Sequence, residues 1–276
     1  MKWWQALVLG LVQGLTEFLP VSSSGHLTFF QRVIPGIDIG GAELFFDIIL
    51  HIGTLVAVCI IFWRDILDLF KKPFKTRLYL VVATIPAGVI GLLLEYFDVV
   101  DLLCGDYVGV VLAVFFTFTA AVLFAAETYA KRRRKVLPIC WRTTLPMGFA
   151  QALAIMPGIS RSGSTIAAGT FAGGTAEDTS KFSFLMSIPV ILGSFFVELA
   201  KGFLDKEEGF AHSFEVAGPQ FGWCIAIGLI VSAIAGLFAI KVMLAAIKKA
   251  NYKWFSLYLV LLAITCIILQ CTGQFA

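Results

Sequence analysis

The sequence predicts an all-α polytopic membrane protein with a single transmembrane domain over residues 1–276. Hydrophobic residues make up 59% of the chain and charged residues only 14%, and the mean hydropathy is +0.91. Soluble domains carry about 25% charged residues and about 45–50% apolar ones. The apolar runs are long and continuous, whereas a transmembrane β-barrel would show alternating segments of about ten residues. No basic run is interleaved with aromatic residues, so we expect no nucleic-acid partner.

Six apolar segments are each long enough to cross a bilayer as a helix, which takes about 20 residues. We expect these spans at residues 42–63, 78–97, 107–129, 179–200, 219–243 and 254–272. Pro86 lies inside the second span and is expected to kink it, because proline removes a backbone hydrogen bond.

A further apolar stretch near the N-terminus is interrupted by polar residues. Its two parts, residues 3–18 and 24–34, are each too short to span about 30 Å of hydrocarbon. Pro20 cannot continue the first helix, and the serines at 22–24 are residue types that begin a new one. A broken backbone is tolerated in lipid only where protein or water surrounds it. We therefore expect a re-entrant helix pair.

The two halves of the chain, about residues 1–135 and 136–276, have the same pattern. The segment Trp141–Phe171 is a second broken stretch, which predicts a second re-entrant pair, and three spans follow it as three follow the first. An offset of 137 residues relates Pro20 to Pro157, Ser23 to Ser160 and Phe45 to Phe182. Because each half has an odd number of spans, we expect an internal repeat of inverted topology.

Charge predicts the orientation of the spans. The loops 64–77, 131–142 and 244–253 are basic, which places them in the cytoplasm by the positive-inside rule. The acidic loop 98–106 and the mixed loop 201–217 then lie outside, as do both termini. The first re-entrant pair would enter from outside and the second from the cytoplasm, so their tips should meet near the middle of the membrane.

The first tip carries groups suited to a metal ion and to proton transfer. Gln13 and Glu17 are four residues apart and share a helix face, and their oxygens suit Mg²⁺ or Ca²⁺. His26 is a candidate general base, general acid or nucleophile, or else a histidine that only hydrogen-bonds the backbone. Ser23 is a candidate nucleophile, while Ser22 and Ser24 are caps that can also bind phosphate.

The second tip is an expected oxyanion site. Arg161 stands beside Ser160, Ser162 and Thr165, and guanidinium, hydroxyl and helix N-terminal N–H groups together bind phosphate. The alternative is that Arg161 only pairs with Glu17 as a structural contact. In the span that follows the first tip, Asp47 and His51 are four apart, and they either support the site or serve helix packing.

The two tips resemble a known family. The segments QGLTEFLPVSSSGH (13–26) and PGISRSGST (157–165) resemble the signature motifs of bacterial undecaprenyl pyrophosphate phosphatases of the bacitracin-resistance type. The segments FFDIILHIGTLVAV (45–58) and KFSFLMSIP (181–189) are also similar to that family. The resemblance implies catalytic roles for Glu17, Ser23, His26 and Arg161. Many members have glutamate where this chain has Gln13, which weakens the expectation of a metal held by two carboxylates.

The implied activity is hydrolysis of undecaprenyl diphosphate, a polyprenyl lipid, to the monophosphate and orthophosphate. This reaction recycles the lipid carrier of cell-wall synthesis, and we expect it at the outer, periplasmic face of the bacterial cytoplasmic (inner) membrane. The expected mechanism is phosphoryl transfer assisted by Mg²⁺ or Ca²⁺, with Ser23 or His26 as the nucleophile or the activator of a water.

A transporter or flippase of an anionic lipid or small anion on the same inverted repeat is the alternative. A hydrolase also needs a nucleophile and proton-transfer groups near the phosphate, and Glu17, Ser23 and His26 meet that need. Small residues in the spans, such as Gly228 and Ser232, serve packing either within one chain or in a homodimer.

Overall fold

The computed structural model describes residues 1–34, 43–71, 74–97, 107–133, 136–204, 218–248 and 252–275, together with residues 99, 102 and 105. Over these ranges the chain is helical, with a single isolated bridge between Leu137 and Gly174. The helices of the first half are α1 (Trp3–Phe18), α2 (Ser23–Val33), α3 (Glu43–Ile61), α4 (Trp63–Asp68), α5 (Lys75–Tyr96) and α7 (Val108–Arg132). Those of the second half are α8 (Trp141–Leu153), α9 (Arg161–Phe171), α10 (Ala176–Leu204), α12 (Phe221–Lys248) and α13 (Lys253–Cys271).

Five helices in the described ranges, namely α5, α7, α10, α12 and α13, are long and apolar enough to cross a membrane. The sixth expected span corresponds to α3, whose apolar part, Phe45–Ile61, is shorter. α5 continues through Pro86. The loops 98–106 and 201–217, expected outside, lie largely outside the described residues. The prediction of an all-α polytopic membrane protein is confirmed.

Both expected helix breaks are present. α1 ends at Phe18 and α2 begins at Ser23, so Pro20 lies in the connection between them. In the second half α8 ends at Leu153 and α9 begins at Arg161, and the connection contains Pro157. The placement of these pairs as re-entrant elements in a bilayer stays a prediction.

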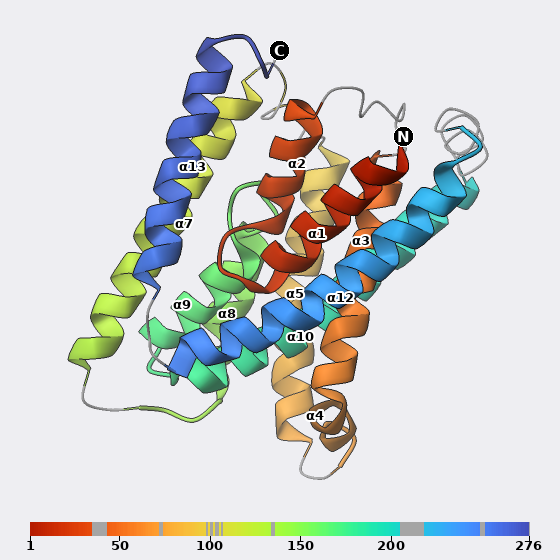
Figure 1. Ribbon diagram of the computed structural model, residues 1–276. Coiled ribbons are helices and arrows are strands. Elements are labelled where there is room, and N and C mark those ends of the chain that lie inside the picture. The colour runs from red at the N-terminus through yellow and green to blue at the C-terminus, as the bar shows by residue number, and fades with distance from the viewer. Residues whose placement is uncertain are drawn as a thin grey trace.

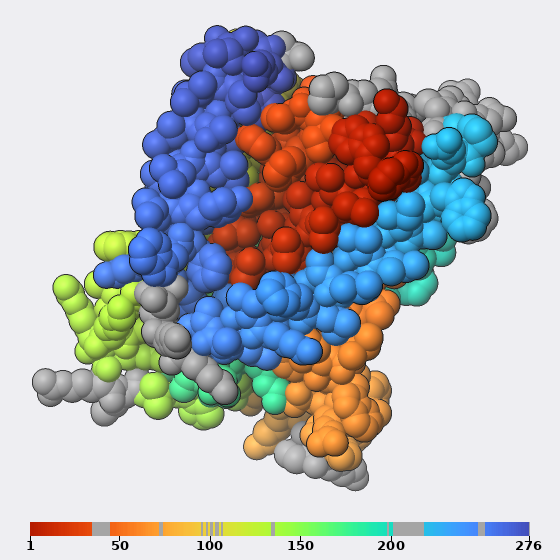
Figure 2. All heavy atoms as spheres, in the orientation of Figure 1, coloured from red at the N-terminus to blue at the C-terminus, as the bar shows by residue number. Residues whose placement is uncertain are grey.

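Small residues bring α1 close to α12, and the two helices run side by side across one face of the molecule (Figures 1 and 2). A Cβ atom added at Gly14 would lie 2.5 Å from the Cβ atom of Ala235 and 2.6 Å from the carbonyl oxygen of Ser232. Gly53 on α3 approaches α12 just as closely, because an added Cβ would lie 2.0 Å from the Ser232 hydroxyl. Glycine at these positions therefore allows the backbones to touch, as in many membrane helix pairs.

Helices of each half of the chain pack on helices of the other half. α1 packs on α12 of the second half, and α8 packs on α5 of the first, while α3 contacts α10 and α7 contacts α13. Figure 1 shows α7 and α13 paired at one side of the molecule, and α1 and α2 lie between α13 and α12 in Figure 2. Each of these contacts has its counterpart when the halves are swapped, which an inverted repeat requires. This packing between the halves brings the two helix breaks together.

Candidate active site at the two helix breaks

The connections of the two broken helix pairs are in direct contact. The Ser162 hydroxyl at the start of α9 donates a hydrogen bond to the carbonyl oxygen of Leu19, at 3.0 Å. An added Cβ at Gly25 would lie 2.8 Å from the Cα atom of Gly158, so glycine permits this approach as well. The expectation that the two tips meet is therefore consistent with the geometry of the molecule.

Each break is followed by a helix N-terminus with a serine cap. The Ser22 hydroxyl accepts a hydrogen bond from the N–H of Gly25 at 3.3 Å, and the Ser160 hydroxyl accepts one from the N–H of Gly163 at 3.0 Å. Ser22 has φ +70°, which makes it the one non-glycine residue with positive φ in the described ranges. Such backbone strain is typical of functional sites. The two caps bring the positive ends of α2 and α9 to the breaks.

The residues expected to bind phosphate differ in their access to solvent. Ser22, Ser160, Ser162 and Thr165 are buried, whereas Ser24 is partly exposed. The Thr165 hydroxyl lies 2.6 Å from that of Ser183 and donates to the carbonyl oxygen of Arg161 at 2.8 Å, while the Ser22 and Ser24 hydroxyls are 3.4 Å apart. Most of these hydroxyls thus hold the helix starts in place.

Glu17 is the centre of the site. Its Oε1 atom accepts a hydrogen bond from the Arg161 guanidinium, which forms an ion pair between the two breaks. Its Oε2 atom accepts hydrogen bonds from the Ser23 hydroxyl at 2.5 Å and from Gln13 Nε2 at 2.9 Å. The Glu17 side chain is 2% exposed and that of Arg161 is 17% exposed. The pairing that the sequence left as an alternative for these two residues is present, and Ser23 shares the same carboxylate.

His26 links α2 to α13. Its Nδ1 atom lies 2.7 Å from the carbonyl oxygen of Ser22, which can only accept, so Nδ1 donates. In the neutral ring Nε2 then accepts from the hydroxyl of Tyr258, at 2.6 Å. The ring is buried, stacks on Tyr258 and meets Phe116 edge-on. Both ring nitrogens are therefore occupied, and the contacts of His26 are those of a residue that holds the start of α2.

Two residues of α3 also reach the site. His51 Nε2 lies 3.6 Å from Glu17 Oε2, and His51 Nδ1 lies 2.7 Å from the carbonyl oxygen of Asp47. Gln31 on α2 donates a hydrogen bond to the Asp47 carboxylate at 2.8 Å. The sequence left Asp47 and His51 open between site support and helix packing. Ionisable residues inside an apolar span are costly, and that cost is the signal that could have assigned these two residues to the site.

The residues at Glu17 fit a divalent cation that arrives with an anionic ligand. Gln13 Oε1 is buried and has no hydrogen-bond partner among the described residues, although it lies next to the carboxylate. No cluster of three or more His, Cys, Asp or Glu residues suited to a metal is found within the ranges described above. Two protein oxygens match Mg²⁺, which keeps several waters and takes phosphate oxygens as further ligands.

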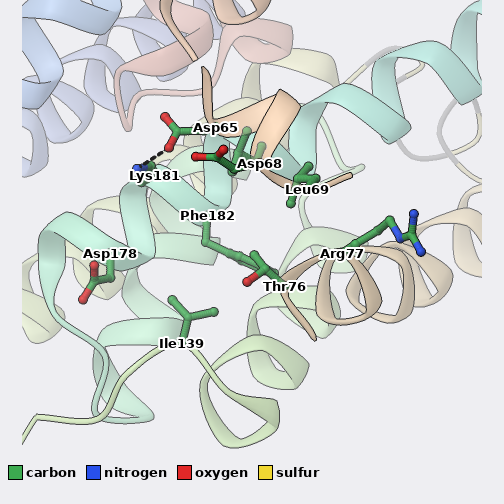
Figure 3. A pocket seen from close by; sticks show the side chains of 10 residues that line it. Asp65, Asp68, Leu69, Thr76, Arg77, Ile139, Asp178, Lys181 and Phe182 are labelled. Carbon is green, nitrogen blue, oxygen red and sulfur yellow. Dashed lines mark ion pairs between the residues drawn. The ribbon is translucent and has the colours of Figure 1, made fainter. Parts of the chain in front are cut away.

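A cavity of about 260 Å³ lies elsewhere, between α4, α5 and α10. Figure 3 shows Asp65 of α4 pointing toward Lys181 of α10, with which it forms an ion pair at 2.6 Å. None of the residues predicted for the site lines this cavity.

A family model described as "Bacitracin resistance protein BacA" matches residues 6–265 of the chain. The chain belongs to the BacA family. It is 38% identical to the undecaprenyl-diphosphatase of Carboxydothermus hydrogenoformans over the whole of both chains. It is also 37% identical to the enzyme of the same name from Halothermothrix orenii, covering 98% of each chain, and 35% identical to that of Parabacteroides distasonis, covering 98% of this chain and 100% of the relative.

Membership of the BacA family agrees with the resemblance on which the sequence analysis relied. The match includes both helix breaks and every residue that contacts Glu17. The candidate site consists of a buried carboxylate in contact with a hydroxyl, an arginine and an imidazole, where the N-termini of α2 and α9 meet.

Proposed function

We propose that this chain hydrolyses undecaprenyl diphosphate to undecaprenyl phosphate and orthophosphate. The full-length relatives named undecaprenyl-diphosphatase support this activity. The observation that carries it is the 2.5 Å hydrogen bond from the Ser23 hydroxyl to the buried Glu17 carboxylate, because a hydroxyl needs a base to become a nucleophile. Arg161 and the starts of α2 and α9 provide positive charge beside that pair, as a diphosphate requires.

Ser23 is the proposed nucleophile. Its hydroxyl oxygen attacks the terminal phosphorus, its proton passes to Glu17 Oε2, and the bond from that phosphorus to the bridging oxygen breaks. Undecaprenyl phosphate leaves, and a phosphoserine remains. Water then attacks the phosphorus and the bond from phosphorus to the serine oxygen breaks. The proton on Glu17 returns to that oxygen, which restores the Ser23 hydroxyl and the Glu17 carboxylate, and orthophosphate leaves with the hydrogens of the water. Ser23 is partly exposed and can meet a phosphate, whereas His26 is buried with both nitrogens occupied, so we assign His26 to positioning α2.

The ion pair of Arg161 with Glu17 weakens during the proposed phosphoryl transfer, which makes the guanidinium available to the phosphate. While Glu17 is ionised, the guanidinium is paired with it. When the proton of Ser23 neutralises Glu17, this attraction weakens and the guanidinium becomes available to the phosphate oxygens on which charge develops. Its 17% exposure is consistent with a group that can reach a bound ligand.

Glu17 and Gln13 are the residues that would hold a divalent cation, Mg²⁺ or Ca²⁺. When bound, the cation would neutralise phosphate charge. The unpartnered amide oxygen of Gln13 supports this assignment, because a buried acceptor without a partner is unfavourable.

The reaction is proposed for the outer, periplasmic face of the bacterial inner membrane, where it would return the lipid carrier of cell-wall synthesis to its monophosphate form. The charge distribution of the loops supports this orientation. The lipid tail would lie along apolar helix faces, which are exposed over much of α12 and α13.

A transporter or flippase of an anionic lipid is the second candidate. The exchange of helix partners between the halves, with two broken helices that meet, is the arrangement found in inverted-repeat transporters. Transport needs binding groups alone, so the paired Ser23 and Glu17 favour hydrolysis.

The experiment is orthophosphate release from C55 diphosphate by detergent-purified protein with Mg²⁺, Ca²⁺ or EDTA. We expect release by the wild type, loss of release with EDTA, and losses of about 10²-fold or more in Ser23→Ala and Arg161→Ala. Ser256→Ala is the matched control, because the hydroxyl of this buried serine donates to the carbonyl oxygen of Tyr252, the residue before α13, at 3.4 Å, and the variant should retain wild-type release. A folded wild type that releases no phosphate but moves the lipid across vesicles would replace hydrolysis with transport.

A further inference from the structure

We propose that the surface where α7 ends and α13 begins binds the headgroup of an anionic phospholipid. Phe124, Glu127 and Lys131 of α7 form this surface together with Lys253 and Trp254 of α13, and we call it the α7–α13 basic surface. It includes none of the residues that contact Glu17, and the proposal does not depend on hydrolysis. Figure 1 shows the two helices side by side, with the start of α13 next to the last part of α7.

Glu127 joins the two helices and leaves the surface with a net positive charge. Its side chain is buried, and its Oε1 atom accepts a hydrogen bond from the Lys131 ammonium at 2.5 Å. Its Oε2 atom accepts another from the backbone N–H of Lys253 at 2.8 Å. One carboxylate therefore stands against two ammonium groups, and the single positive charge that remains matches the single negative charge of a phosphodiester.

The ammonium of Lys253 is the group that is open to a ligand. Among the described residues it has no carboxylate partner. Its Nζ atom lies 5.8 Å from the centre of the Phe124 ring, and both side chains are exposed. An ammonium over an aromatic ring is held by the ring on one side only. Its other side can therefore donate hydrogen bonds to phosphate oxygens.

The two ammonium groups are close enough to share one headgroup. The Lys131 ammonium bonds Glu127, and the Lys253 ammonium lies over Phe124, three residues before Glu127 on α7. Residues three apart are neighbours on a helix surface. The two cations are thus about one helical turn apart, about 5 Å along the axis of α7. A phosphate group with two anionic oxygens can contact both of them.

Apolar surface continues from the basic surface along both helices. The exposed large apolar side chains in this direction are Phe118 and Val114 of α7 and Trp254, Leu257 and Leu261 of α13. A phospholipid bound by its headgroup would lay its acyl chains on these residues, which a free phosphate ion could not use. Both lysines lie in the basic ranges 131–142 and 244–253, which predict the cytoplasmic leaflet, where anionic lipids attract basic segments.

The experiment measures Tm of the detergent-purified full chain as dioleoylphosphatidylglycerol or dioleoylphosphatidylcholine is added. We expect the anionic lipid to raise Tm of wild type and the zwitterionic lipid to leave it unchanged, because a ligand that binds only the folded state stabilises it. Lys253→Gln removes the open ammonium but keeps the backbone N–H that bonds Glu127, so without lipid it should unfold close to the wild-type temperature. It should need about fivefold more of the anionic lipid for the same increase in Tm. Lys253→Arg should respond as wild type does.

Lys71→Gln is the matched control, because Lys71 is also exposed but its ammonium is paired with Asp68 at 2.7 Å. It should keep the wild-type response to the anionic lipid. An equal weakening in Lys71→Gln and Lys253→Gln would show that the lipid responds to net charge alone, which would overturn a site on this surface. A wild-type response in Lys253→Gln, no increase in Tm of wild type, or an equal increase with the zwitterionic lipid would also overturn the proposal.

Discussion

The ion pair between Arg161 and Glu17 connects the two helix breaks. Arg161→Ala would leave the Glu17 carboxylate, 2% exposed, without its main counter-charge. Removing one partner of a buried ion pair costs about 3–5 kcal/mol. Because the Arg161 side chain is 17% exposed and already partly solvated, we expect the lower end of this range, about 3 kcal/mol. That destabilisation corresponds to a decrease in Tm of about 6–12 °C.

A second substitution shows whether this cost comes from the unpaired charge. Glu17→Gln together with Arg161→Ala removes both charges, and an amide can still serve Ser23 and Gln13. The double variant should therefore have a higher Tm than Arg161→Ala alone. Coupling between two residues in contact is about 0.5–3 kcal/mol.

The assay is thermal unfolding of wild type, Arg161→Ala, Glu17→Gln and the double variant in the same detergent. Lys71→Ala is the matched control, because Lys71 and Asp68 form an ion pair at 2.7 Å with side chains 73% and 62% exposed. Exposed pairs contribute about 0–1 kcal/mol, so this variant should unfold near the wild-type temperature. Additive decreases in the double variant would refute the reasoning, since the two breaks would then not be coupled by charge.

Two further predictions concern packing and positioning. Gly14→Ala should destabilise the fold by about 1–3 kcal/mol and lower Tm, because the added Cβ would lie 2.5 Å from the Cβ of Ala235. Gly88→Ala, whose added Cβ would have nothing within 4 Å, should leave Tm unchanged. Equal Tm values for the two variants would contradict the close contact between α1 and α12. Tyr258→Phe removes the hydroxyl that lies 2.6 Å from His26 Nε2 and leaves that buried nitrogen without a partner. We expect the free energy of unfolding to fall by about 1–3 kcal/mol and phosphate release to fall several-fold. Unchanged release and Tm would show that water replaces the hydroxyl.

Residue types that are close together in the sequence were enough to predict the helix breaks and some of the contacts of Glu17. Proline at position 20 ends a helix wherever it occurs, and the serines that follow supply an N-cap, so the start of α2 follows from neighbouring residues alone. The pairing of Glu17 with an arginine was also among the sequence-based alternatives, because an isolated arginine inside a membrane is unfavourable. Residues four apart, such as Gln13 and Glu17, share a face on any helix.

Other contacts between distant segments could not be predicted from the sequence. The partner of His26 is Tyr258, which is 232 residues away on a helix whose apolar pattern does not reveal which face meets α2. His51 was open between two roles because the rotation of α3 relative to α1 depends on the glycine contacts with α12.

The sequence by itself therefore determined the membrane class, the helix breaks and the residue types at each break, since these depend on hydropathy and local backbone preference. The tertiary structure alone decided which side chains share the Glu17 carboxylate and which of its oxygens each one contacts. The reason is that hydrogen bonds act over about 3 Å, and helix packing sets positions at that scale through contacts far apart in the chain.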